Sequence, residues 1–222
     1  MMLAGSDERT LRHGSLLPRR RAPYRMLMPQ AVEPWTRAKV LALPDDGMRH
    51  ELIDGIHIVS PAPRFLHQRV VEVLGEHIRR YLKPLRLASV MILSGDLAMG
   101  EDEVLQPDLF VYPLTAQRVR EWTDIKSLLL AAEVLSPSTA RHDRGIKRRR
   151  YQRARTPEYW VVDIDARLVE RWRPDDRRPE VLDASLEWRV TPDAPPLVID
   201  LPALWREALF EDGGDERVPT TS

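Results

Sequence analysis

Two stretches near the middle of the chain decide the fold: VLQPDLFVY at residues 104–112 and LLLAAEVLSPS at residues 128–138. Each holds an apolar run typical of a buried strand, and each carries one acidic residue, Asp108 in the first and Glu133 in the second. Acidic residues are depleted in strands and are rarely buried unless they are paired or bind a cation. Two such strands predict a rigid pair of hard oxygen ligands for a divalent metal ion. The alternative is that each acid ends its strand and pairs with an arginine.

A strongly basic segment follows the strand that carries Glu133. Residues 141–155 hold eight lysines and arginines against one acid, Asp143. We expect residues 136–139 to end the strand and cap a helix over about 144–154. On that helix Asp143, Lys147 and Tyr151 fall on one face. Lys147 is a candidate for the site of Glu133, because its helix directly follows that strand; the alternative is a solvated Asp143–Lys147 ion pair. For the arginines, phosphate contact and a solvated surface are equally open.

The flanking segments predict further helices and strands. Asp54-Gly55 lies between two apolar runs and indicates a hairpin, since both positions favour residues that tolerate positive φ. Residues 66–82 have apolar side chains at helical spacing and indicate an amphipathic helix that stops near Pro84. The other expected elements are a helix over 37–43 capped by Thr36, strands at 50–53, 56–60, 89–93, 96–99, 159–164 and 168–172, a turn at 165–166, and a helix around 203–210.

Length and composition fit one globular domain with an extension at each end. The chain has 222 residues, of which 43% are hydrophobic and 31% charged, which suits one α/β or α+β domain on a mixed sheet flanked by helices. We expect this domain to span 29–211, after a disordered basic extension over 1–28 and before a disordered acidic tail over 212–222. A basic arm for nucleic acid and a translation start at Met26 or Met28 are alternative interpretations of the extension.

The composition excludes several classes of protein. There are no cysteines, which rules out disulfides, thiolate zinc sites, iron–sulfur clusters and a cysteine nucleophile. No apolar run approaches the roughly 18 residues of a membrane span, and the N-terminus lacks a signal-peptide pattern, so we expect a soluble cytoplasmic protein without a membrane partner. Lys plus Arg and Asp plus Glu both number 34, so net charge gives no indication of a nucleic-acid partner.

Several motifs, in order along the chain, resemble the Uma2 (DUF820) family of endonucleases, a branch of the PD-(D/E)XK nuclease superfamily. The resemblance covers about Trp35 to Leu209 and implies a restriction-endonuclease-like fold. The motifs that carry it are HELIDG (50–55), SPAP followed by HQRVV (67–71), QPDLFV (106–111), EVLSPST (133–139), HDRGIKRRRY (142–151) and PEYWVVD (157–163).

The resemblance also implies roles for single residues. Pro107-Asp108 stands where the superfamily has its PD motif, and Glu133 matches the acid of (D/E)XK. Leu135 departs from the pattern, because it occupies the place of the superfamily lysine on the same side of the strand as Glu133. The resemblance suggests that Lys147 supplies the missing ammonium. Glu51 matches a recurring glutamate that is either a further ligand or a tie between the hairpin and the sheet.

The implied activity is that of a metal-dependent endonuclease acting on nucleic acid, with DNA as the expected substrate. Mg²⁺, or Mn²⁺ in its place, would be bound by Asp108 and Glu133 and would lower the pKa of the attacking water. Lys147 would orient that water or stabilise developing charge. His67, expected at a helix start or core edge, and Tyr151, expected to pack, are accessory candidates. The residues expected to hold the nucleic-acid backbone are Arg144, Arg148 and Arg149.

Other functions remain open from the sequence. A catalytically inactive module that binds nucleic acid through a nuclease fold is supported by Leu135 in place of lysine. An enzyme for RNA or another phosphate ester is a second alternative, because no segment is recognisable as a reader of bases or 2′-hydroxyls. A homodimer would suit double-strand cleavage by analogy.

Overall fold

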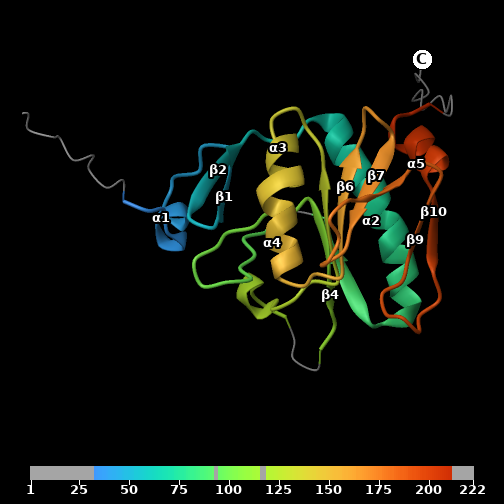
Figure 1. Ribbon diagram of the computed structural model, residues 1–222, viewed down its shortest axis with the longest axis horizontal. Coiled ribbons are helices and arrows are strands. Elements are labelled where there is room, and N and C mark those ends of the chain that lie inside the picture. The colour runs from blue at the N-terminus through green and yellow to red at the C-terminus, as the bar shows by residue number, and fades with distance from the viewer. Residues whose placement is uncertain (1–32, 93–94, 116–118, 212–222) are drawn as a thin grey trace, which may run out of the picture. The chain divides into compact units, whose positions relative to one another are not determined.

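A six-stranded mixed sheet forms the centre of the domain in the computed structural model, which describes residues 33–92, 95–115 and 119–211 (Figure 1). The sheet contains the single parallel pair β5–β6, and its other neighbours are antiparallel. In spatial order its strands are β3 (Ala88–Met91), β4 (Leu109–Pro113), β5 (Leu130–Val134), β6 (Glu158–Asp163), β7 (Leu168–Trp172) and β8 (Glu180–Leu182). The expected fold class, an α+β domain on a mixed sheet flanked by helices, is therefore confirmed.

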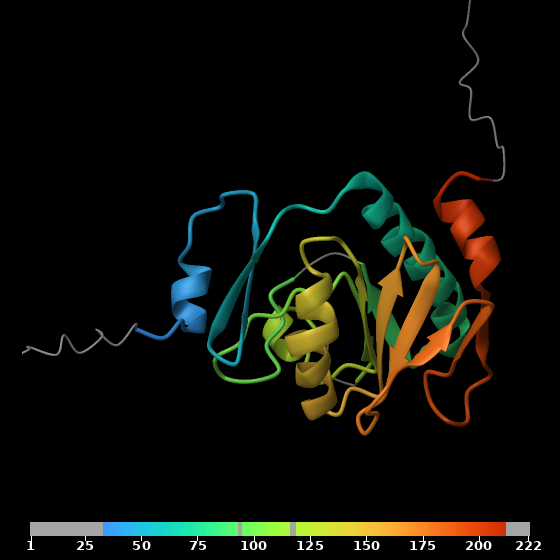
Figure 2. The ribbon, with the colours of Figure 1, turned by 45° about the horizontal axis from the view of Figure 1, so that its top comes forward.

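Helices cover both faces of this sheet, and the strand residues alternate between them (Figure 2). The long helix α2 (Phe65–Leu85) and the helix α5 (Leu201–Ala208) share one apolar core with Leu130, Ala132 and Trp160. On the other face, Ala131 and Val161 pack in a second core with Tyr151. Period-two alternation of this kind is what a sheet buried on both faces requires. The second face is covered by α3 (Ala140–His142), a π-helical turn η2 (Asp143–Lys147) and α4 (Arg148–Arg153).

Two hairpins and two short helical segments complete the domain. The first hairpin joins β1 (Arg49–Ile53) and β2 (Ile56–Ser60) through Asp54 and Gly55, whose φ angles are +52° and +74°, so the expected hairpin is confirmed. It follows α1 (Arg37–Leu41), which Thr36 caps by accepting a hydrogen bond from the backbone N–H of Lys39. The second hairpin pairs β9 (Ser185–Trp188) with β10 (Leu197–Asp200), and the 3-10 turn η1 spans Trp122–Asp124.

Some expected boundaries were wrong. The strand expected over 104–112 begins only at Leu109, so Asp108 precedes β4 rather than lying inside it. Pro107 has no N–H to donate to a ladder, which explains the late start. Similarly, the strand expected at 96–99 is reduced to a single bridge between Leu97 and Leu105. By contrast, the helix α2 ends at Leu85, near Pro84 as expected, and its C-cap residue Arg86 adopts a left-handed φ of 55°.

Other expectations failed in the basic and C-terminal segments. The basic helix begins at Ala140 rather than near residue 144 and contains the π-helical turn. The strands β8, β9 and β10 were not expected, because they are short and lie between prolines that weaken a strand pattern. The predicted extensions at 1–28 and 212–222 lie outside the described residues, as do residues 29–32 of the predicted domain.

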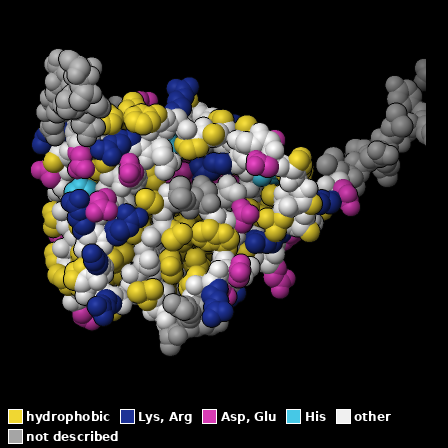
Figure 3. Space-filling model, turned by 180° about the vertical axis from the view of Figure 1, so that it is seen from behind, with side chains coloured by type: hydrophobic (Ala, Val, Ile, Leu, Met, Phe, Trp, Pro, Cys, Tyr) yellow, Lys and Arg dark blue, Asp and Glu magenta, His cyan; other side chains and the backbone are white. Residues whose placement is uncertain are grey.

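The surface mixes charges of both signs. Figure 3 shows the face opposite that of Figure 1, where lysines and arginines alternate with acidic side chains rather than forming a stripe of one sign. Among the helices within the described ranges, none is both long and apolar enough to cross a bilayer.

Candidate active site

Asp108 is held by three different elements. Its side chain is 6% exposed. Its Oδ1 lies 2.7 Å from Nη1 of Arg49 on β1, and its Oδ2 accepts a hydrogen bond from the backbone N–H of Val134 on β5 at 2.9 Å. Oδ2 also lies 3.1 Å from Nε2 of His67 in the first turn of α2. Burial raises the pKa of Asp108, but the hydrogen bond to His67 and the charge of Arg49 outweigh burial and lower the pKa to about 2.

Glu133 lies on the face of β5 that the basic helix covers. Its carboxylate is 2% exposed, and its Oε1 lies 3.1 Å from Nζ of Lys147. The hydroxyl of Tyr151 donates to the same oxygen at 3.5 Å. Burial raises the pKa of Glu133 well above its ordinary value, although the Lys147 ammonium opposes the rise.

Lys147 is surrounded by carboxylates. Besides Glu133, its Nζ lies 2.7 Å from Oε2 of Glu51 and 3.4 Å from Oδ1 of Asp143. Burial lowers the pKa of Lys147, but the three carboxylates raise it well above its ordinary value, so the ammonium stays charged. The second oxygen of Glu51 accepts a hydrogen bond from the backbone N–H of Gln106 at 2.8 Å. Glu51 therefore ties the first hairpin both to the segment before Asp108 and to Lys147.

These residues form one buried charge cluster, in which acids outnumber permanent cations. The four carboxylates and two cations leave two negative charges in excess when all are ionised and His67 is neutral. Burial raises the pKa of Asp143 as well as that of Glu133, as expected where negative charge is not fully compensated. The members of the cluster are Glu51, Asp108, Glu133, Asp143, Arg49 and Lys147.

The π-helical turn positions Asp143 and Lys147 within the cluster. The backbone N–H of Arg148 donates to the carbonyl of Asp143, five residues earlier, and the hydroxyl of Tyr159 donates to the same carbonyl at 3.0 Å. Asp143 and Lys147 are only 1% and 3% exposed. The solvated Asp143–Lys147 ion pair considered as an alternative was therefore wrong, because both side chains face the sheet. Single π-helical turns of this kind are common at functional sites.

The expected site residues come together, with Lys147 beside Glu133 although it is 14 residues further along the chain. Leu135 is half-buried at the end of β5 and belongs to the apolar core on this face. Tyr151 is fully buried and stacks on Tyr159 with ring centroids 4.8 Å apart. Their catalytic roles stay predictions.

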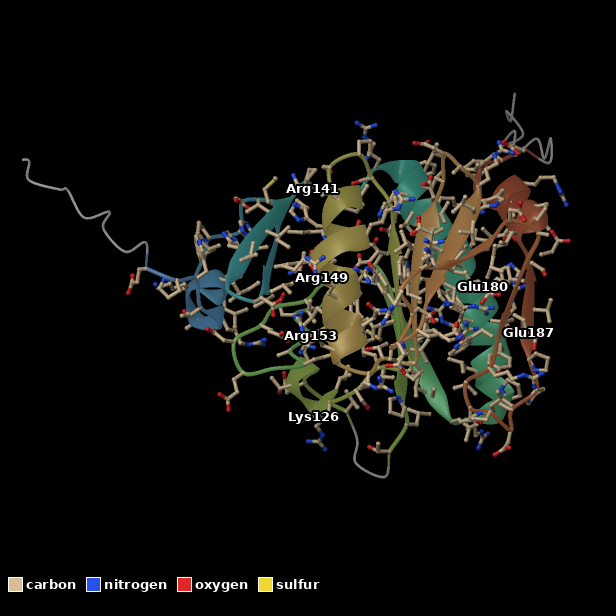
Figure 4. The ribbon with its side chains drawn as sticks, viewed as in Figure 1. Lys126, Arg141, Arg149, Arg153, Glu180 and Glu187 are labelled. Carbon is tan, nitrogen blue, oxygen red and sulfur yellow. The ribbon has the colours of Figure 1, made fainter. Side chains whose placement is uncertain are left out.

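The three arginines expected to bind nucleic acid lie in different surroundings. Arg144 contacts Asp163 at 2.8 Å and Glu170 at 2.7 Å. The guanidinium of Arg148 lies 4.6 Å from the centre of the Trp172 ring. Arg149 is exposed and, within the described part of the chain, has no ion-pair partner (Figure 4). Of the three, Arg149 is thus the most available for an external anion.

Two contacts at the site were missed from the sequence. Arg49 lies one residue before the HELIDG motif, and its alternation with Glu51 on β1 puts both on one side of the strand; this spacing was the available signal. Arg150 forms a buried pair with Glu103 through two nitrogens, one of them 2.7 Å from Oε2. No sequence pattern links these two residues, which are 47 positions apart.

The carboxylate oxygens of the buried charge cluster are the kind of ligand that a hard divalent cation prefers. Mg²⁺ is usually held by one or two protein carboxylates, with waters and substrate phosphate completing its shell. Asp108 and Glu133 provide two carboxylates at one place, and the excess of two negative charges in the buried charge cluster equals the charge of one such ion. Within residues 33–92, 95–115 and 119–211, no three histidine, aspartate or glutamate side chains are arranged to hold one metal ion.

Comparisons with known proteins identify the family and the fold of the chain. The family model Uma2, described as "Putative restriction endonuclease", matches residues 37–202. A solved structure, described as a "putative nuclease belonging to DUF820" from Anabaena variabilis ATCC 29413, superimposes with a TM-score of 0.62 at 23% identity. The match covers 79% of this chain and 99% of that one, and at this identity it shows the fold alone. No curated protein sequence matches the chain.

Proposed function

The chain belongs to the Uma2 family of nucleases, and from this premise we propose that it is a metal-dependent endonuclease that hydrolyses phosphodiester bonds in DNA. The observation that carries the proposal is the buried charge cluster, whose carboxylates exceed its cations by two. Buried charge without compensation costs stability and has no structural benefit here. A substrate phosphate cannot relieve it, since it is itself negative. A divalent cation relieves it directly.

Asp108 and Glu133 are the residues proposed to bind Mg²⁺ or Mn²⁺, while Glu51 holds Lys147 beside them. When bound, such an ion lowers the pKa of a coordinated water and offsets the negative charge of the phosphate. Asp108 suits this role because its low pKa keeps it ionised at neutral pH. His67, Arg49 and the Val134 amide hold its carboxylate in one orientation.

Lys147 is proposed to act at the phosphate. Its Nζ is held at Glu133 by the covering helix, which gives the ammonium one location in a site that excludes water. Its Nζ would keep Glu133 and exchange its contact with Glu51 or Asp143 for the attacking water or a phosphate oxygen. Lys147 would thereby stabilise the negative charge that develops during attack. In this way it would replace the lysine missing at Leu135.

DNA is proposed as the substrate because the family is described as restriction endonucleases, which act on DNA. The experiment is cleavage of supercoiled plasmid by purified protein with Mg²⁺ or Mn²⁺, in parallel with EDTA. Asp108→Asn should reduce cleavage to background. A matched aspartate-to-asparagine change at Asp175, which pairs with Arg155 at the surface, should leave it unchanged. A structured RNA of similar length tests the competing substrate.

The possible outcomes are distinct. Metal-dependent nicking that is lost with EDTA and in Asp108→Asn supports the proposal and its site. Cleavage that persists in Asp108→Asn points to a contaminating nuclease or a different site. Folded protein that binds DNA but cleaves nothing with either metal would favour the inactive binding module.

A further inference from the structure

A cavity of about 300 Å³ borders the buried charge cluster at Arg49, which pairs with Asp108. Its lining comes from the connection between β2 and α2 and the connection between β5 and α3. Both connections lie at the same end of the sheet in the ribbon views (Figures 1 and 2). Its volume is several times the roughly 30 Å³ that one water occupies in the liquid. The polar residues that line the cavity are Arg49, Arg64, His67, Ser136, Ser138 and Thr139. The other lining residues are Ala62 and three prolines, so no lining residue is acidic.

The basic residues of this cavity have unused donor capacity. Arg64 is exposed and has no carboxylate partner among the described residues. His67 is 7% exposed, and its Nδ1 is buried without a hydrogen-bond partner while Nε2 contacts Asp108. Nε of Arg49 is likewise buried without a partner. Unpaired buried polar groups are rare in native structures, because each costs the free energy of desolvation. His67 and Arg49 both line the cavity, although these two nitrogens themselves lie behind its surface.

The N-terminus of α2 adds a second feature that favours an anion. This helix is 21 residues long, and Arg64, its N-cap residue, makes no capping hydrogen bond through its side chain. The first backbone N–H groups of a helix have no partner within the helix and carry the positive end of its dipole. Arg64 and His67 belong to the N-cap and first turn and line the cavity, so it lies at this end of the helix.

Hydroxyl groups line the opposite side. The Ser136 hydroxyl lies 3.0 Å from the hydroxyls of Ser138 and Thr139. Each hydroxyl has one donor and two acceptor positions, so this group can rotate to donate to an external oxygen. Donors therefore surround the cavity from β1, α2 and the β5–α3 connection. A tetrahedral phosphate, with oxygens pointing in several directions, suits such a set better than a planar carboxylate.

We propose that this cavity is a phosphate subsite, which binds a phosphate group of the nucleic acid next to the one that is cleaved. Arg49 and His67 contact both the cavity and Asp108, so the bound phosphate lies one side chain away from the catalytic carboxylates. A second cavity of about 420 Å³ shares Arg64, His67 and Ser136, and its lining also includes the Arg144–Asp163 pair and Asp165. Its apolar side chains Leu66, Leu135 and Ile164 offer a surface to the sugar and base attached to this phosphate.

That the bound phosphate belongs to a nucleic acid rests on the proposed nuclease function. That the cavity binds phosphate does not. The first test is therefore a calorimetric titration of the full chain with inorganic phosphate in EDTA, where no cleavage takes place. Arg64→Gln should raise the dissociation constant for phosphate about tenfold, the loss expected for one hydrogen bond to a charged group. The matched control is Arg80→Gln, because Arg80 lies on the same helix and pairs with Glu76 away from the cavity. The control removes the same charge and should bind phosphate as the unchanged protein does.

The second test distinguishes two sources of the phosphate group. If the subsite binds a terminal phosphate monoester, an oligonucleotide with a 5′-phosphate should bind about tenfold more tightly than the same oligonucleotide with a 5′-hydroxyl, and Arg64→Gln should remove the difference. If it binds an internal diester, both oligonucleotides should bind equally and Arg64→Gln should weaken both. Either result supports the subsite and specifies its ligand.

The proposal is overturned if phosphate does not bind, or if Arg64→Gln and Arg80→Gln weaken it equally, because the effect would then be one of net charge. Unfolding temperatures of both variants, expected to match the unchanged protein because both side chains are exposed, exclude loss of the fold as the cause. Failure of plasmid cleavage with intact phosphate binding would count against the nuclease function alone.

Discussion

Glu133 and Asp108 are two carboxylates of one site whose pKa values are shifted in opposite directions. Asp108 is buried, but three donors favour its ionised form. Glu133 is equally buried and shares its single ammonium with Glu51 and Asp143. The pKa of the first is therefore lowered and that of the second raised. The metal-free protein thus contains a residue whose ionisation opposes folding, a cost often found at functional sites.

The first prediction is that Glu133→Gln stabilises the metal-free protein while abolishing cleavage. Gln is never ionised, so it removes the cost of ionising this buried carboxyl and should raise the free energy of unfolding by on the order of 1 kcal/mol, or the unfolding temperature by roughly 2–4 °C for a domain of this size. Differential scanning calorimetry in EDTA measures this. Glu72→Gln, the same change at an exposed residue of α2, should have almost no effect. A less stable Glu133→Gln protein would contradict the charge argument.

The same residue predicts how stability depends on pH. Because the folded pKa of Glu133 is raised above its ordinary value of 4.5, the folded state keeps a proton that the unfolded state releases. By linkage, its contribution to the free energy of unfolding falls as pH rises above 4.5, until the folded-state pKa is passed. Asp108 has the opposite sign: its contribution is present above pH 3.8 and is lost as pH falls toward about 2. Calorimetry of the unchanged protein and Glu133→Gln between pH 5 and pH 8 should show a steeper decline in the unchanged protein.

The second prediction concerns Lys147, whose removal should affect stability as well as rate. Lys147→Met keeps much of the side-chain volume but leaves three buried carboxylates without their ammonium, which should cost about 3–5 kcal/mol in the metal-free protein. Adding Glu133→Gln should recover part of this loss, because one of the three charges is then gone. Chemical denaturation of both single variants and the double variant measures the coupling. Additive effects would show that the Lys147–Glu133 contact at 3.1 Å carries no net energy.

The residue scale also shows what the sequence could and could not predict. Asp108 and Glu133 were predictable because an acid beside an apolar run is unusual whatever the fold. Arg49 was not, because an arginine before a hairpin is ordinary, and its contact with Asp108 depends on a segment 59 residues away. The burial of Asp143 depends likewise on the π-helical turn, which has no known sequence period. The long-range partners of charged residues are thus the part that required the structure.

At the scale of elements, two glycines show which helices tolerate a larger side chain. Gly75 lies inside α2 against the sheet, where an added Cβ would lie 2.3 Å from Cγ2 of Ile92 and 3.4 Å from Cδ1 of Leu109. Gly145 lies in the π-helical turn, where an added Cβ would contact no atom within 4 Å. One glycine is therefore required by packing between α2 and the sheet. The other only increases the conformational entropy of the unfolded chain.

The third prediction is that alanine at these two positions has opposite effects. Gly75→Ala should destabilise the protein by about 1–3 kcal/mol, because Ile92 is a branched side chain in a packed layer. Gly145→Ala should stabilise it by about 0.5–1 kcal/mol, provided that the π-helical turn is kept. Thermal unfolding measures both. A loss of cleavage in a more stable Gly145→Ala protein would show that alanine converts the turn to a regular α-helix and moves Lys147 away from Glu133.

The sequence predicted the long helices and strands better than the short ones, because a short element holds too few residues to show a period. The helix α2 and the first hairpin were predictable, because one has five turns of apolar periodicity and the other has an Asp-Gly turn. The strand β7 was predicted with its observed bounds, Leu168–Trp172, since its alternation is regular. β8 has only three residues, which is too short for any period to be distinguished from chance. Such edge strands are determined by the neighbour to which they pair rather than by their own sequence.

At the scale of the whole molecule, the net charge is zero, and most basic side chains of the helix over 140–153 and its end also pair locally with acidic side chains. Of the eight basic residues over 141–155, most have partners: Arg144 pairs with Asp163 and Glu170, Lys147 lies in the buried charge cluster, and Arg150 pairs with Glu103. Two outer pairs are Arg153–Asp54 and Arg155–Asp175. Arg148 is half-buried and contacts Gln152 and the Trp172 ring. Arg141 and Arg149 are exposed and, within the described residues, have no carboxylate partner; both are labelled along the helix in Figure 4. The basic segment therefore presents much less free charge than its sequence indicates.

The fourth prediction is that DNA binding depends only moderately on salt, and that Arg141 and Arg149 account for the part due to this helix. Each phosphate neutralised by a protein cation contributes about −0.9 to the slope of log K against log salt concentration. The double variant Arg141→Gln/Arg149→Gln should therefore reduce the magnitude of the slope by about 2. The measurement is fluorescence anisotropy of a labelled duplex in EDTA between 50 and 200 mM salt, the range over which such slopes are usually compared.

The matched control also removes two positive charges, but from two arginines of the same helix and its end that already pair with carboxylates. Arg153→Gln/Arg155→Gln should leave the slope nearly unchanged, because the carboxylates of Asp54 and Asp175 already occupy these guanidinium groups. If both double variants reduce the slope equally, the surface ion pairs open when DNA binds, and the whole basic helix is the binding face. If neither does, DNA approaches through another surface, and the phosphate cavity at the start of α2 becomes the first place to look for it.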